Sequence, residues 1–230
     1  MHKNGTTDVF IRHEELGHGG FAYVYRATLK YTNKTYAIKV ISKEFADIKG
    51  KLTLKNLKNE MKLQKHLYHP NIVGSKMSFS DELNYYIVLE YCPGRSVREY
   101  LKKSDNGYLT EPETRKILKD VLLGLIFLHN NNIVHHDLKL ENFVIGKNGK
   151  VKITDFGLSA LLKNEDQKQH LLGGTKNYMS PEIIKNEAHS FGVDIWAIGV
   201  ATFMMLTGKP PFESCTKELT FEKIKNCDYH

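Results

Sequence analysis

The residues best suited to chemistry lie in one short stretch, VHHDLKLEN, which runs from Val134 to Asn142. Asp137 supplies a carboxylate, Lys139 a cation and Asn142 an amide oxygen, directly after an apolar run typical of a helix. In phosphoryl transfer a carboxylate accepts the proton of an attacking hydroxyl, a cation faces the moving phosphate, and an amide oxygen helps to bind magnesium. The stretch alone does not distinguish a phosphoryl-transfer site from a polar loop that follows a helix. The choice between these two interpretations depends on matching segments elsewhere in the chain.

A glycine turn near the N-terminus is a candidate phosphate-binding element. Residues 10–30 alternate in the manner of two strands, and the connection between them reads LGHGGFAYVY. Gly17 and Gly19 allow the backbone to come close to phosphates, and Val24 can cover a flat base. A lone turn of this kind is more often a simple hairpin, and Ala22 stands where G-x-G-x-x-G has its third glycine.

The next predicted strand, TYAIKVI, places Lys39 among apolar neighbours. An unpaired ammonium is costly to bury there, so Lys39 needs anionic partners. The helical pattern of residues 52–67 offers Glu60. A helical glutamate is usually a solvated charge, but its position between the lysine strand and HPNIV favours an ion pair with Lys39.

Further segments frame the candidate site on both sides. Residues 85–92 form an apolar and aromatic strand that ends at Pro93-Gly94, a break that suits a connection between two lobes. Thr110 has the features of a helix cap, with proline and acidic residues in the first turn that follows. Asn148-Gly149 predicts a hairpin turn, and this hairpin returns the chain to Asp155 of a DFG triplet.

In this order the segments resemble eukaryotic protein kinases: glycine loop, V-A-I-K strand, helix glutamate, hinge, H-R-D-L-K-x-x-N loop and D-F-G. The resemblance covers nearly the whole chain from about Phe10. It implies an α+β bilobal protein kinase fold, with a tail at residues 1–9, a small mostly-β N-lobe at 10–91 and a larger mostly-α C-lobe at 92–230. The C-lobe is expected to be incomplete, lacking its last helices, and the two lobes together form one kinase domain.

The resemblance also implies ATP and Mg²⁺ as cofactors. Asp137 and Lys139 would be catalytic, and Asn142 and Asp155 would bind the metal. The residues expected to bind ATP are Leu16, Gly17, Gly19, Val24, Ala37, Lys39, Glu60, Leu89, Glu90, Cys92 and Val144.

Sequence motifs in the C-terminal part are similar to those of particular branches of the family. GTKNYMSPE is typical of serine/threonine kinases, and HSFGVDIWAIG, GKPPFES and KELTFEKIKNCDY are similar to polo-like kinases, with the aurora type as the alternative. The resemblance implies that Thr175 touches the catalytic loop and that Asp194 ties the central helix to that loop. Glu182 would pair, buried, with an arginine that this sequence does not contain.

Two departures from the family concern regulation. His136 stands where kinases activated by loop phosphorylation have an arginine that binds the phosphate. Leu171 stands where polo-like kinases have the threonine that is phosphorylated, and residues 160–174 contain no Ser, Thr or Tyr. We therefore expect that loop phosphorylation does not regulate this protein. Glu141 stands where polo-like kinases tend to have glycine, and its charge predicts a weaker preference for acidic substrates.

Composition limits the remaining possibilities. The 230 residues are 41% hydrophobic, enough for a sizeable core, and no apolar run reaches membrane-spanning length. The start, MHKNGTTD, has no signal-peptide character, so we expect a soluble cytoplasmic or nuclear protein. The three cysteines, Cys92, Cys215 and Cys227, are odd in number and share no metal-ligand spacing, so we expect free thiols. The net charge of +7 is spread along the chain, which argues against nucleic acid as a partner. The resemblance to serine/threonine kinases implies protein Ser/Thr substrates.

Two classes of function remain open at this point. The first is an active serine/threonine protein kinase, which the presence of Lys39, Asp137, Asn142 and Asp155 favours. The second is a catalytically incompetent kinase-like binding module or a truncated fragment, which the early end of the sequence favours. In the second case an exposed apolar patch on the incomplete C-lobe would require a covering partner.

Overall fold

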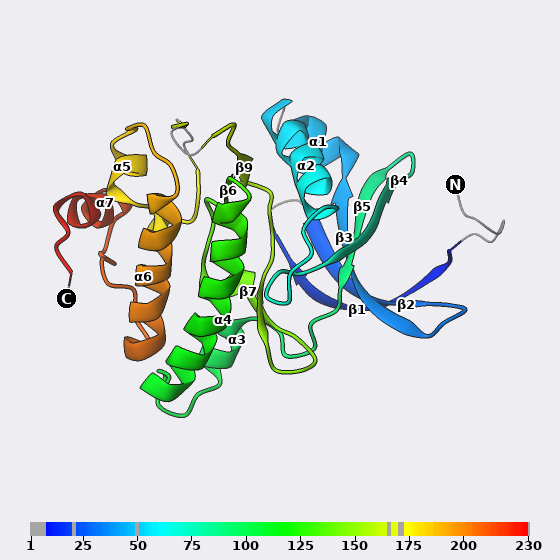
Figure 1. The fold of residues 1–230 in the computed structure, drawn as a ribbon, viewed down its shortest axis with the longest axis horizontal. Helices are drawn as coiled ribbons and strands as arrows, with labels where there is room; N and C mark the ends of the chain where they lie inside the picture. Colours follow the sequence, from blue (N-terminus) through cyan, green and yellow to red (C-terminus); the bar gives the residue numbers. More distant parts are fainter. Residues whose placement is uncertain (1–7, 20–21, 49–50, 165–166, 170–172, 230) are drawn as a thin grey trace. The chain divides into compact units, whose positions relative to one another are not determined.

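The computed structural model describes residues 8–19, 22–48, 51–164, 167–169 and 173–229. The chain divides into two compact units, one formed by Met1–Tyr68 and Val73–Cys92 and the other by His69–Ile72 and Pro93–His230 (Figure 1). The division after Cys92 falls one residue from the lobe boundary expected from the sequence.

The first unit contains a five-stranded antiparallel sheet in the order β1-β2-β3-β5-β4. Its strands are β1 (Phe10–His18), β2 (Ala22–Leu29), β3 (Lys34–Ser42), β4 (Ser75–Ser80) and β5 (Asn84–Glu90). The strands predicted at residues 10–30, 35–41 and 85–92 are confirmed. β4 was not predicted, because its sequence SKMSFS is mostly polar and lacks the run of branched residues that marks a strand.

The register of this sheet decides which side chains share a face. Val24 pairs with Lys39, and Ala37 pairs with Leu89. Cross-strand partners and alternate residues lie on the same face, so these four side chains project from one side of the sheet. The other side carries an apolar cluster of Ala27, Leu29, Tyr36, Ile38 and Val88.

Two helices follow β3 in the first unit, α1 (Lys43–Ile48) and α2 (Lys51–Gln64). Figure 1 shows both beside the end of β3. Leu57 and Leu63 of α2 are buried, as the apolar periodicity of this segment requires. The helix ends at Gln64 rather than near Leu67, since the His66 N–H bonds the Leu63 carbonyl in a tighter turn.

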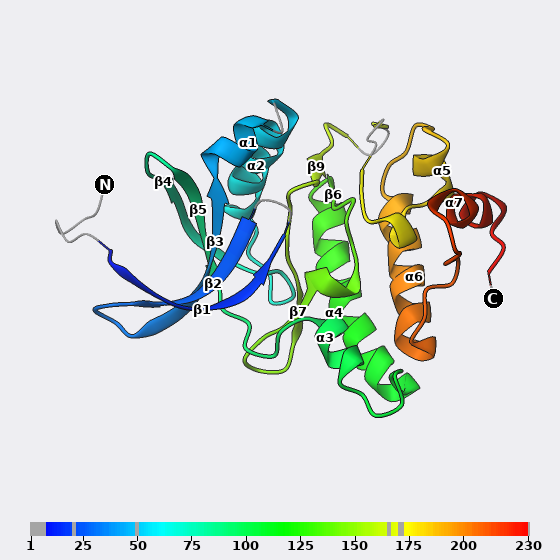
Figure 2. The same ribbon diagram turned by 180° about the vertical axis from the view of Figure 1, so that it is seen from behind.

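The second unit is mainly helical. Its helices are α3 (Val97–Lys102), α4 (Glu111–Asn130), α5 (Pro181–Ile184), α6 (Gly192–Thr207) and α7 (Lys217–Asn226), with 3₁₀ turns η1 (Leu140–Asn142) and η2 (Lys176–Tyr178). Short strands pair as β6 (Ile133–Val134) with β9 (Ala160–Leu161) and β7 (Phe143–Ile145) with β8 (Val151–Ile153). Figures 1 and 2 show α4 and α6 side by side, and their inward side chains, among them Leu125, Leu128 and Met204, form the core. No helix in the described ranges is long and apolar enough to cross a membrane.

Local signals explain where these elements begin and end. Thr110 caps α4 in a capping box with Glu113, as the sequence predicted. Gly149 has φ +74° in the predicted turn between β7 and β8. Gly208 ends α6 with φ +76°, and an added Cβ would lie 2.3 Å from the Gly107 carbonyl oxygen, so only glycine fits there. Cys92, Cys215 and Cys227 are free thiols, as expected.

Candidate active site

The carboxylate of Asp194, in the first turn of α6, holds the candidate catalytic loop by its backbone. Its Oδ2 accepts the His135 N–H and its Oδ1 accepts the His136 N–H, both at 2.9 Å. The His129 Nε2 of α4 lies 3.0 Å from Oδ2. Burial alone would raise the pKa of Asp194, but the hydrogen bonds from His129 and from the His135 N–H keep it below its usual value. The anion therefore fixes the loop on the central helix.

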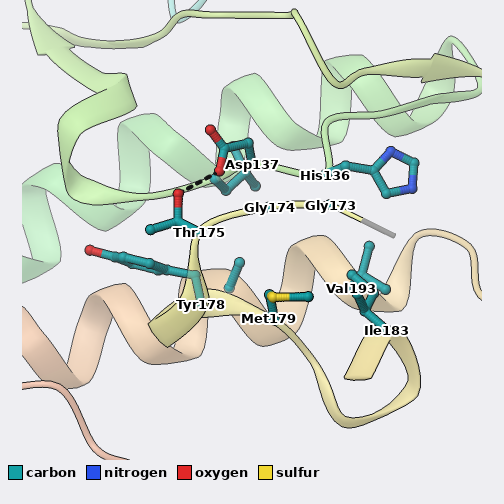
Figure 3. Close-up of a pocket in the computed structure, with 11 residues that line it drawn as sticks. His136, Asp137, Gly173, Gly174, Thr175, Tyr178, Met179, Ile183 and Val193 are labelled. Carbon is teal, nitrogen blue, oxygen red and sulfur yellow. Dashed lines mark hydrogen bonds between the residues drawn. The ribbon is translucent and has the colours of Figure 1, made fainter. Parts of the chain in front are cut away.

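Asp137 lies at the centre of a second set of hydrogen bonds. The Lys139 Nζ donates to Asp137 Oδ2 at 2.6 Å and to Thr175 Oγ1 at 2.8 Å. The Thr175 hydroxyl donates to Asp137 Oδ1 at 2.8 Å, the dashed line in Figure 3. The Asn142 Nδ2 donates to the Asp137 carbonyl at 2.8 Å and to Oδ2 at 3.2 Å. The structure thus brings together three residues of the loop and Thr175, which lies far away in the sequence.

Asn142 and Asp155 have the chemistry expected of magnesium ligands. Because the Asn142 Nδ2 is used by Asp137, the amide oxygen faces elsewhere, and no hydrogen bond to that oxygen is found among the described residues. Asp155 follows Thr154, whose N–H donates to the Asn142 carbonyl at 3.0 Å. Amide and carboxylate oxygens suit Mg²⁺, which usually completes its octahedron with water and phosphate oxygens. Among the described residues no cluster of three or more His, Cys, Asp or Glu is placed to hold a metal ion.

His135 orients the loop from the other side. Its Nε2 lies 3.1 Å from the Thr154 carbonyl and its Nδ1 lies 3.3 Å from the Asp137 N–H. A carbonyl only accepts and an N–H only donates, so His135 donates from Nε2 and accepts at Nδ1. The ring also packs on Phe156, with centroids 5.1 Å apart. His135 therefore links the loop to the DFG segment.

In the first unit, Lys39 and Glu60 form the predicted ion pair. The Lys39 Nζ lies 2.7 Å from Glu60 Oε1, and the two side chains are only 15% and 4% exposed. β3 supplies the lysine and α2 the glutamate. The same sheet face carries Val24, Ala37 and Leu89, so these four predicted nucleotide-binding residues of the sheet share one surface.

Gly17 and Gly19 leave open space beside the backbone. A Cβ built at either position would meet no atom within 4 Å, and neither residue has a positive φ. The Gly19 N–H closes the turn on the Ala22 carbonyl at 2.8 Å. Contacts within the described chain therefore do not require glycine at either position.

The other predicted ATP-binding positions are placed as follows. Leu16 is half-buried in β1, and Val144 lies in β7 of the second unit, opposite Lys152. The Glu90 N–H donates to the Gly74 carbonyl at 2.8 Å. Cys92 is half-buried after the end of β5.

One regulatory position, Glu182, differs from what the sequence suggested, and a second, Leu171, is not described. Glu182, expected to be a buried charge, is only half-buried at the start of α5, so the large cost of an unpaired buried ion does not apply. No ion pair of Glu182 is found in the described part of the chain. Leu171 lies outside the described residues.

Sequence reasoning missed two residues that shape the site. The Tyr178 hydroxyl accepts the Leu140 N–H at 3.4 Å, and burial together with the nearby Glu141 charge raises its pKa. Gly174 has φ +114°, and a Cβ there would lie 3.3 Å from the His136 carbonyl oxygen. Figure 3 shows Gly173 and Gly174 running past His136 and Asp137. The Gly-Gly pair before Thr175 was the available signal for this close approach.

Comparison with known proteins agrees with this geometry. The family described as the protein kinase domain matches residues 10–229. The chain therefore belongs to the protein kinase domain family, and the resemblance noted from its motifs is confirmed.

Individual relatives indicate the branch. The chain is 39% identical over 216 residues to the cell cycle serine/threonine-protein kinase CDC5/MSD2 of Saccharomyces cerevisiae, covering 93% of this chain and 30% of that protein. It is 41% identical over 214 residues both to the serine/threonine-protein kinase plk-2 of Caenorhabditis elegans and to polo of Drosophila melanogaster, covering 93% of this chain and 33% and 36% of those proteins. The names of these relatives agree with the polo-like branch that the C-terminal motifs indicated. The chain spans about a third of the length of these relatives.

Proposed function

We propose that this chain is the catalytic domain of a polo-like serine/threonine kinase, which transfers the γ-phosphate of ATP to Ser or Thr hydroxyls of proteins. The observation that carries the proposal is the hydrogen-bonded set of Asp137, Lys139, Asn142 and Thr175. A carboxylate, a cation and an amide are held together by the protein before any substrate binds. Such preorganisation is what phosphoryl transfer requires of a protein.

The bonds of Asp137 support its role as the group that accepts the proton. A carboxylate offers about four lone-pair positions. Lys139 and Asn142 use those of Oδ2, and Thr175 uses one on Oδ1. One position on Oδ1 remains for a substrate hydroxyl, so Asp137 would orient that hydroxyl and take its proton. Lys139 would face the phosphate that is transferred.

Residues of the first unit would contact ATP. Lys39, oriented by Glu60, would contact its phosphates, and the face carrying Val24, Ala37 and Leu89 would contact its base. Asn142 and Asp155 would hold Mg²⁺, which neutralises phosphate charge when bound.

The experiment separates catalysis from nucleotide binding. Phosphate incorporation into a Ser/Thr peptide library and the thermal shift caused by Mg-ATP are measured on the same protein. We expect Asp137→Asn to abolish incorporation and to keep the shift, and Lys39→Met to lose both. Lys58→Met, which removes an exposed lysine of α2, is the matched control and should behave as wild type. A wild-type protein with a Mg-ATP shift but no incorporation would favour the alternative, a kinase-like binding module.

We also propose that phosphorylation of residues 160–174 does not control this activity. Those residues contain no Ser, Thr or Tyr. His136, at the position of the phosphate-binding arginine, is 7% exposed, and burial lowers its pKa to about 4, so it carries no charge for a phosphate at pH 7. The test is treatment of the active protein with phosphatase, against a sample with inhibited phosphatase. An activity loss of ten-fold or more would contradict the proposal.

A partner that covers the second unit remains a prediction. Leu123 and Ile126 of α4 and Ile195 of α6 are 43%, 55% and 55% exposed apolar side chains that a partner could cover. Sedimentation at increasing protein concentration tests for self-association, and an unchanged sedimentation coefficient would count against a second copy as that partner.

A further inference from the structure

The exposed side of α2 carries a row of lysines that the reaction proposed above does not use. Lys58 and Lys62 lie in this helix and Lys65 directly follows its end, and all three are exposed. Their spacing of i, i+4 and i+7 places them along one face of the helix. Lys51 and Lys55 precede them in the sequence at the same spacing. We call Lys58, Lys62 and Lys65 the lysine row.

The opposite face of α2 is turned into the protein. Leu57, Glu60 and Leu63 are buried there, and Glu60 Oε1 lies 2.7 Å from the Lys39 Nζ. Glu60 is the only acidic residue in the sequence of α2, so this helix has no other carboxylate to offer to the row. Among the described residues, none of the three ammonium groups of the row has an ion pair.

This arrangement of charge is unfavourable for α2. Like charges at spacings of three and four residues repel one another and destabilise a helix. The first turn also contains no acidic residue, although the N-terminal end of a helix favours negative charge. An anion bound along the row would remove the repulsion, and because it binds the ordered helix it would stabilise that form.

The buried side of α2 carries a second unfavourable group. Gln64, one turn after Glu60, is 1% exposed, and neither atom of its amide group has a hydrogen-bond partner among the described residues. A buried amide without a partner weakens the packing that holds the helix in place. The packed position of α2 is therefore opposed from both faces, and a ligand on the outer face has a larger effect than it would have on a stable helix.

The structure favours one class of anionic partner over three others. A membrane surface does not fit, because the apolar residues Leu57 and Leu63 are buried and do not reach lipid. Nucleic acid fits poorly, because the sequence of α2 contains no aromatic residue on which bases stack. A second copy of the chain does not fit either, since no three acidic residues of its sequence follow the spacing i, i+4, i+7 or i, i+3, i+7. The spacing of the row matches carboxylates on one face of another protein's helix.

We propose that the lysine row is a docking surface for an acidic α-helix of a partner protein, in which Glu or Asp recurs at the spacing i, i+4, i+7. Each carboxylate of that helix faces one lysine of the row. The docking itself does not depend on the proposed kinase function. Its consequence rests on that function: the docked helix stabilises α2, which holds Glu60 against Lys39 and so supports the binding of ATP phosphates.

The first test compares two synthetic peptides of the same composition, both made of Ala and Glu. In the patterned peptide Glu recurs at i, i+4, i+7, i+11 and i+14, and in the scrambled peptide the Glu residues share no helix face. Fluorescence anisotropy with the whole chain should show about ten-fold tighter binding of the patterned peptide, and added salt should weaken it. Oligo-dT and phosphatidylserine vesicles are the comparison probes. Equal binding of the two peptides, or tighter binding of either comparison probe, would overturn the proposal.

Charge reversal locates the site. The row variant combines Lys58→Glu, Lys62→Glu and Lys65→Glu, and it should bind the patterned peptide about ten-fold more weakly than the wild type. The control variant makes the same change of charge at exposed lysines of α3 and α4, namely Lys102→Glu, Lys116→Glu and Lys119→Glu. If the row variant does not fold, replacement of the same three lysines by Gln takes its place, with a smaller loss expected. Equal losses in the row variant and the control variant would refute docking at α2.

The consequence for the active site is measured separately. Saturating patterned peptide should slow hydrogen exchange of α2 and lower the KM for ATP about three-fold in the wild type, and do neither in the row variant. Binding without slower exchange would refute the stabilisation of α2. An active kinase that does not bind the peptide would refute the docking, whereas binding with slower exchange in an inactive protein would count against the kinase function alone.

Discussion

Replacing Asp194 by Asn tests how much the anchor of the catalytic loop contributes to stability. The substitution keeps the shape of the side chain but exchanges one accepting oxygen for an NH₂ group. If that group takes the place of Oδ2, the His135 N–H and the His129 contact both lose their acceptor. If it takes the place of Oδ1, only the His136 N–H does, so we expect this second orientation.

The magnitude follows from the bonds that change. One hydrogen bond to a charged group is lost in the buried site, worth about 1.5 to 3 kcal/mol, and the two that remain become weaker, neutral bonds. The lower cost of burying an amide than a carboxylate offsets part of this loss. We therefore expect the free energy of unfolding to fall by about 3 kcal/mol.

Denaturation in urea, with the unfolding free energy extrapolated to water, provides the measurement. Glu218→Gln is the matched control, since Glu218 is also an acidic residue in the first turn of a helix but is exposed. The control loses only the favourable interaction with the helix N-terminus, about 0.3 to 1 kcal/mol. A loss in Asp194→Asn no larger than that of the control would refute the argument that the carboxylate holds the loop.

Three further predictions concern the same unit. Between pH 6.5 and 4 the unfolded chain protonates His136 and the folded protein does not, so acid lowers the unfolding free energy by about 3 kcal/mol in that window. Urea denaturation at several pH values should show a flatter dependence for His136→Asn, and an unchanged slope would contradict the lowered pKa. Gly174→Ala should destabilise by about 1 to 3 kcal/mol, because Gly174 has a φ of +114° and a Cβ there would lie 3.3 Å from the His136 carbonyl oxygen. Gly199→Ala, in the open part of α6, should stabilise by about 0.5 to 1 kcal/mol. Equal effects of the two substitutions in thermal unfolding would contradict this reasoning. The carboxylate of Glu141 lies 3.7 Å from the Arg98 Nε, and both side chains are partly exposed. The negative charge of Glu141 should repel acidic peptides, so a peptide array should show no preference for them. The variant Glu141→Gly should phosphorylate acidic peptides several-fold more than the wild type does. A strong acidic requirement in the wild type would show that Glu141 has no such influence.

Much of the site could be predicted because its signals are local. Thr110 with Glu113 marks the start of α4, and Asn148-Gly149 marks the hairpin, since capping and turn geometry depend on a few neighbouring residues. The pairing of Lys39 with Glu60 was also predicted, because a lysine on a buried strand needs an anion and the next helix offers one. Strand β4 escaped prediction because its polar side chains carry no apolar pattern.

The sequence by itself determined which groups are available: the loop of Asp137, Lys139 and Asn142, the strand lysine and the DFG aspartate, all named by type and spacing. Only the tertiary structure decided how they are held. It joined Thr175 to Asp137, made the buried carboxylate of Asp194 the acceptor for two loop N–H groups, and packed the ring of His136 against that of His189. The physical reason is that hydrogen-bond partners and burial depend on which distant segments pack together, and burial in turn decides whether an imidazole carries a charge.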